Sequence, residues 1–141
     1  EIIGNGCKEE IFEILLYPEN MQKIQHAFED LSGDYGATFL MSLIDICRHS
    51  TEFCQELISD VFTVKLNQYL IDSLHYPVVS LFPLRILSLI EVLLESNSER
   101  TSMLKTKMFI NGVKSFLNRN IQTNDKALTI LRMIDQNPVE H

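Results

Sequence analysis

Cys47, His49 and Cys54 come closest, by type and spacing, to a chemical site in this chain. Thiolates and imidazoles bind zinc, and a thiol beside an imidazole can act as a nucleophile. The spacing C-x-H-x4-C matches no usual structural zinc motif, and residues two apart on a helix point about 200° apart. A fourth ligand would have to come from Cys7 or His26. The pattern therefore favours buried cysteines, and we expect no metal site.

The chain also lacks the short motifs that position a reactive group. It contains no G-x-S-x-G, P-loop, dinucleotide-binding glycine pattern or H-E-x-x-H sequence. No Gly-rich loop or strained turn lies near a cysteine to supply donors for an oxyanion. We therefore predict a protein that is not an enzyme and carries no cofactor.

Composition restricts the partners and the compartment. The 141 residues are 45% hydrophobic and carry a formal charge of −7, which indicates one globular domain and argues against nucleic-acid binding. No apolar run is long enough to span a bilayer, so no membrane insertion is expected. The odd number of cysteines, three, fits a reducing compartment, the cytoplasm or the nucleus. The tail 139–141 looks like the start of a tag, so the predicted domain is 1–138.

Apolar spacing and turn residues predict helices throughout the chain. Asp60 is expected to cap the fifth helix, and Thr123 or Asn124 the last one. Pro83 either lies near the start of its helix, at about Phe82, or kinks it. The expected helices span about 7–16, 18–31, 37–49, 51–59, 60–74, 82–95, 98–105, 108–117 and 124–137.

One apolar triplet at helical spacing occurs three times, with an offset of 44 residues. A period of this length is typical of stacked helical repeats, whose units bury their apolar sides against one another. The expected order is three helices per unit, the short helix first, three times over. The triplets are Leu40, Leu43 and Ile46; Leu84, Leu87 and Ile90; and Leu128, Leu131 and Ile134.

Residues 77–90 resemble the third helix of an armadillo repeat, in which a proline and a valine lead into A-L-R-x-L-x-x-L. They read P-V-V-S-L-F-P-L-R-I-L-S-L-I, and residues 127–134 read similarly. The resemblance covers nearly the whole chain. It implies an all-α fold, a right-handed superhelical stack of about three degenerate armadillo-like repeats. HEAT-type repeats remain an alternative. So does a helical domain of the VHS or ENTH type, although the constant recurrence argues against the latter.

The resemblance also indicates where a partner would bind. In importin-type armadillo proteins, an Asn on the third helix bonds an extended peptide, and a Trp one turn earlier stacks on its side chains. Other residues stand at these places here, so we do not expect the same ladder of backbone contacts. They are Asp45, Leu89 and Met133 at the Asn positions, and Met41, Arg85 and Thr129 at the Trp positions.

We predict that the face of the stacked third helices binds a protein partner, as a helix or a hydrophobic peptide segment. Its arginines would meet acidic groups, and its apolar residues would hold an apolar anchor. Reversing the charge of Arg85 together with Leu89→Asp is expected to abolish binding and leave helicity intact. The predicted partner-binding residues are Met41, Asp45, Arg48, Arg85, Leu89, Val92, Met133 and Gln136.

The expected function is therefore a non-catalytic scaffold or adaptor domain. The alternative is a homo-oligomerising structural module that pairs through an apolar end or face of the stack. Ile130 and Met133 on the last helix suggest such an end, because no later segment is expected to cover them.

Overall fold

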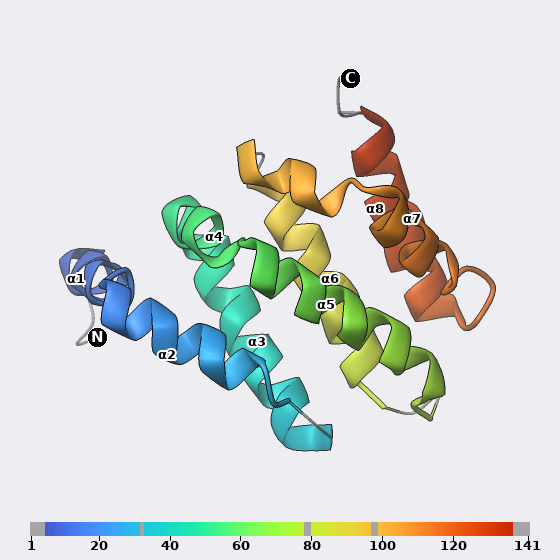
Figure 1. The fold of residues 1–141 in the computed structure, drawn as a ribbon, viewed down its shortest axis with the longest axis horizontal. Coiled ribbons are helices and arrows are strands. Elements are labelled where there is room, and N and C mark those ends of the chain that lie inside the picture. Colours follow the sequence, from blue (N-terminus) through green and yellow to red (C-terminus); the bar gives the residue numbers. More distant parts are fainter. Residues whose placement is uncertain (1–4, 32, 78–79, 97–98, 137–141) are drawn as a thin grey trace.

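The protein is all-helical, as predicted, over residues 5–31, 33–77, 80–96 and 99–136, the part of the chain that the computed structural model describes (Figure 1). Side chains are described for 10–31, 35–77, 80–96 and 99–134, and the expected tag remnant at 139–141 lies outside these ranges. No helix among the described residues combines the length and apolar character needed to cross a membrane. The elements are α1 (Asn5–Leu15), α2 (Pro18–Phe28), α3 (Gly33–His49), α4 (Thr51–Leu57), α5 (Asp60–Asp72), η1 (Ser73–His75), α6 (Phe82–Glu95), η2 (Glu99–Leu104), α7 (Lys107–Lys114) and α8 (Ile121–Gln136).

Hydroxyl side chains fix the starts of three helices. Ser50, Ser59 and Thr106 each accept a hydrogen bond from the backbone N–H three residues later, at 3.1, 3.2 and 3.4 Å. Each cap satisfies a donor that the first helical turn leaves without an intrahelical partner. The cap of α5 is therefore Ser59, and the prediction of Asp60 is wrong by one residue.

The starts of α6 and α8 also follow from single residues. Pro83 lies in the first turn of α6, where its missing N–H breaks no helical hydrogen bond, and the helix begins at Phe82. Asn120 precedes α8, and its Oδ1 accepts a hydrogen bond from the N–H of Thr123 at 3.0 Å. The cap thus lies before the predicted Thr123 or Asn124. The short helix expected at 98–105 is a 3-10 helix, η2.

The helices form two layers (Figure 1). In one layer α6 lies between α3 and α8. The contacts of α6 with α3 and with α8 are the most extensive among the described elements. The other layer contains α5 and α7, which pack on each other. Across the layers, α5 packs on α6, and α7 packs on α8. α2 joins this second layer through Phe28, whose ring centre lies 4.4 Å from that of Phe62 in α5. The central helix α6 is therefore covered by neighbours on three sides.

Aromatic side chains connect the two layers. The ring of Tyr69 in α5 meets Phe28 at 5.2 Å and Phe82 of α6 at 5.8 Å, both nearly edge-on. Tyr76 stacks on Phe82, with ring centres 4.9 Å apart. Edge-to-face and stacked pairs of this kind add stability beyond the area that they bury.

The recurring apolar triplet is buried unevenly. Leu43 and Leu87 are in the core, with 2% and 0% of their surface exposed. Leu84 is only half-buried, although its counterpart Leu40 is fully enclosed. Burial instead matches Leu40 with Ile86, so α3 and α6 are related by 46 residues rather than 44. Because of this shift of two residues, the side of α6 that faces outward differs from the side that the 44-residue recurrence predicts.

Arginines tie successive parts of the chain together through backbone carbonyls. Arg85 in α6 donates to the carbonyl of Ala37 in α3 at 2.9 Å. Arg100 donates to two carbonyls at the end of α4, at 2.7 and 3.3 Å. Arg119 reaches the carbonyl of Leu74 in the same way. Arg100 and Arg119, from later segments of the chain, thus donate to carbonyls near the ends of earlier helices, where intrahelical donors are missing.

Candidate functional site

The outward side of α3 presents three of the predicted site residues. Met41 is 44% exposed, and Asp45 and Arg48 are also exposed. Nη1 of Arg48 lies 4.0 Å from Oδ1 of Asp45, and both side chains are more than half accessible. Because both side chains are exposed, their charges are accessible to a partner. An exposed pair of this kind adds little stability.

Arg85 does not stand free on the predicted face. Its side chain is half-buried, and its guanidinium donates to the carbonyl of Ala37 across the contact between α3 and α6. The structure therefore gives Arg85 a role within the fold, where the sequence had indicated a free cation for acidic partner groups.

Leu89 and Val92 were predicted to hold an apolar anchor, and this prediction is wrong. Leu89 is 0% exposed and Val92 is 5% exposed, so both belong to the core. The physical reason is the central place of α6, which α3, α5 and α8 all contact. Only one narrow strip of α6 faces outward, and it comprises Leu84, Ser88, Glu91 and Glu95.

On α8 the predicted residue Met133 is less accessible than expected. Met133 is half-buried and packs against the core. The side chain of Gln136 lies outside the described part of the chain. Ile130, expected to be uncovered at this end of the stack, is 0% exposed, so that expectation is wrong.

A hollow of about 380 Å³ lies between α6 and α8, on the outward side of both helices. Leu84 supplies its apolar surface, and Lys126 stands at its edge, with Nζ 2.5 Å from Oε1 of Glu91. Because the Glu91 and Lys126 side chains are only 17% and 31% exposed, water screens this ion pair less than a surface pair. The remaining lining residues are Gln122, Asp125 and Thr129.

Sequence reasoning missed this hollow, although a signal for it was present. α6 is apolar almost all round, which is typical of a helix enclosed on most sides. Three of its four polar residues, Ser88, Glu91 and Glu95, fall on one strip at i, i+3 and i+7. That strip marks the outward side, and Leu84 extends it by one turn.

Cys47 and Cys54 lie inside the fold, as the sequence favoured, whereas the side chain of Cys7 lies outside the described part of the chain. Cys47 and Cys54 are 4% and 1% exposed, and Sγ of Cys54 donates to the carbonyl of Cys47 at 3.3 Å. The hydrogen bond with the neighbouring thiol and the burial both raise the pKa of Cys47, so this group stays protonated at neutral pH. His49 is exposed, with Nδ1 2.8 Å from the carbonyl of Asp45. No group of three or more metal-ligating side chains occurs within the described residues.

Comparison with family models, with curated proteins and with solved structures finds no match to this chain. The armadillo resemblance therefore stays a prediction, and the geometry alone bears on function.

Proposed function

We propose that this domain is a non-catalytic protein-interaction module, a scaffold or adaptor that binds a partner helix or peptide on the face of α3, α6 and α8. The hollow between α6 and α8 is the observation that carries the proposal. Binding sites commonly combine an apolar surface with a few polar groups that fix orientation, and the hollow has both. The proposed location is the cytoplasm or the nucleus, on the strength of the odd cysteine count.

The chemistry of the hollow suits an amphipathic helix. Leu84 would receive an apolar side chain, since it is the one apolar residue of the lining. Asp125 would meet a polar group beside that anchor, and Lys126, which pairs with Glu91, supplies the opposite charge. On α3, Met41 and the Asp45–Arg48 pair extend the same kind of surface. A helix that lays spaced apolar anchors on such a surface is a recurring mode of peptide recognition.

Leu84→Glu is expected to weaken partner binding by at least roughly 30-fold, the loss typical of a central interface residue. The partner would first be recovered from cell extract with the wild-type domain. It would then be purified and titrated against the wild type and the variant by calorimetry. Thermal unfolding of the variant would be measured in parallel, because Leu84 is half-buried.

The matched control is Ile14→Glu, which replaces an exposed apolar residue of α1, 51% accessible, by the same charge. Its binding should equal that of the wild type. The proposal is rejected if Leu84→Glu stays folded and binds as tightly as the wild type, or if both variants lose binding equally.

A homo-oligomer is the competing function, and one observation favours it. Val61, Val64 and Ile71 lie on one side of α5 and are 66%, 64% and 44% exposed. An accessible apolar stripe of this kind is often an interface. This alternative predicts that the mass from light scattering rises with protein concentration, and that Val61→Lys with Val64→Lys returns it to one chain. A mass equal to one chain at every concentration would reject the alternative.

A further inference from the structure

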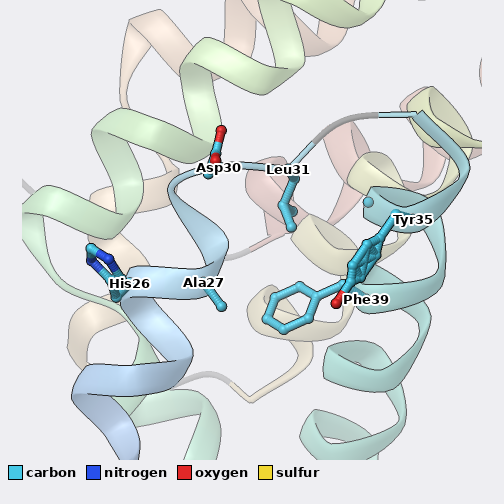
Figure 2. Close-up of a pocket in the computed structure, with 7 residues that line it drawn as sticks. His26, Ala27, Asp30, Leu31, Tyr35 and Phe39 are labelled. Carbon is cyan, nitrogen blue, oxygen red and sulfur yellow. The ribbon is translucent and has the colours of Figure 1, made fainter.

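A second cavity, of about 330 Å³, lies between the end of α2 and the first turns of α3 (Figure 2). Ala27 and Leu31 line it on the α2 side, and the rings of Tyr35 and Phe39 line it on the α3 side. Asp30 stands at its rim. The volume is near the lower limit of about 300 Å³ for small-molecule pockets, so it suits one large side chain.

The walls of this cavity are held in place by the fold. The hydroxyl of Tyr69 accepts a hydrogen bond from the N–H of Leu31 at 2.8 Å and donates to the carbonyl of Phe28 at 2.5 Å. Gly36 packs tightly on Leu31, because an added Cβ would lie 3.2 Å from Cβ of Leu31. The Leu31 side of the cavity is therefore preformed, which lowers the conformational entropy lost on binding.

The cavity mouth carries negative charge. It lies at the C-terminal end of α2, where the helix dipole is negative, and Glu29 and Asp30 follow directly. Glu29 has His26 as a partner at 3.9 Å. Among the residues that the structure describes, no cation pairs with Asp30. Burial raises the pKa of Tyr69, and the carboxylates of Asp30 and Glu29 add to this effect, which agrees with a negative potential at this end of α2.

The cavity combines aromatic rings on its α3 side with a carboxylate at its rim on the α2 side, and this combination favours a cation with a flat face. Tyr35 is 79% exposed, and its ring is open to a ligand. A guanidinium group stacks on aromatic faces and pairs with a carboxylate through two parallel hydrogen bonds, whereas an ammonium group does neither as well. The aliphatic stem of an arginine can pack on apolar surface at the same time, here on Leu31 and Phe39.

We propose that this cavity receives an arginine side chain of a partner protein, with the guanidinium stacked on Tyr35 and paired with Asp30. The site is separate from the face of α3, α6 and α8. Phe39 and Met41 are two residues apart on α3, so they point about 200° apart around the helix axis. A negative result at one site therefore does not contradict the proposal for the other site.

The test uses small probes on the full chain, at low ionic strength. Nα-acetyl-arginine amide is titrated into isotope-labelled protein, with Nα-acetyl-citrulline amide as the neutral probe of the same shape. Saturable amide shifts are expected at Leu31 and Gly36 with the arginine probe alone, with a dissociation constant on the order of 1 mM. Asp30→Asn should weaken this binding by about tenfold, and Tyr35→Ala should weaken it further.

Both variants change exposed side chains, so they are expected to fold. Glu52→Gln, an exposed carboxylate on α4, is the matched control and should bind as the wild type does. Equal shifts with citrulline, no shift at Leu31 or Gly36, or unchanged binding by Asp30→Asn would each overturn the proposal. Equal binding of Nα-acetyl-lysine amide would reject the preference for arginine.

Discussion

Replacing Leu89 by aspartate is expected to unfold the domain at room temperature. Leu89 is completely enclosed in α6, which packs between α3 and α8. Removing a leucine side chain from a core costs about 2–5 kcal/mol, and an unpaired buried carboxylate costs several kcal/mol more. The whole free energy of unfolding of a domain is about 5–15 kcal/mol, so the two losses together are comparable with it. This outcome replaces the sequence-based expectation that Leu89→Asp, combined with charge reversal of Arg85, removes binding and leaves helicity intact.

Far-UV circular dichroism and urea unfolding would measure the effect. Met41→Asp is the matched control, since it introduces the same charge at a 44% exposed position of α3 and should change the free energy of unfolding by less than about 1 kcal/mol. A cooperative urea transition for Leu89→Asp, within about 1 kcal/mol of the wild type, would contradict the central place of α6 in the fold.

The helices were predictable because their signals are local. Apolar spacing, proline positions and hydroxyl caps act within one or two turns, and the starts of α4, α5 and α6 lie within two residues of the predictions. The predicted face failed at α6 because burial depends on neighbours rather than on the helix itself. The 44-residue recurrence matched Leu84 with Leu40, whereas packing matches Ile86 with Leu40.

The α2–α3 cavity depends on contacts that no local pattern contains. Its wall residue Leu31 is held by a hydrogen bond to Tyr69, which is 38 residues away in the sequence. Gly36, which also lines the cavity, packs closely on Leu31 and Phe82, and such packing follows only from the three-dimensional arrangement. Likewise, the sequence indicated that Arg85 is a free surface cation. Only its hydrogen bond to the carbonyl of Ala37 in α3 shows that it supports the fold. Such long-range polar pairings need a three-dimensional arrangement before they can be inferred.

Tyr69→Phe is expected to lower the free energy of unfolding by about 2–4 kcal/mol. The substitution keeps the ring and its contacts with Phe28 and Phe82. It removes only the hydroxyl that joins the N–H of Leu31 to the carbonyl of Phe28. Both backbone groups then lose their partner at the end of α2, and each unpaired buried group costs about 1–3 kcal/mol. Urea unfolding at neutral pH would measure the change.

Tyr76→Phe is the matched control, because Tyr76 belongs to the same aromatic cluster and stacks on Phe82. It should change stability by less than about 0.5 kcal/mol. The pH dependence gives a second test. The pKa of Tyr69 is raised, chiefly by burial, so the folded state holds this proton more tightly than the unfolded state. Its contribution is complete below the ordinary tyrosine pKa of about 10 and is lost as pH rises above it. The wild type should therefore lose more stability above that pH than Tyr69→Phe does, and parallel losses in the two proteins would contradict the bridging role of the hydroxyl.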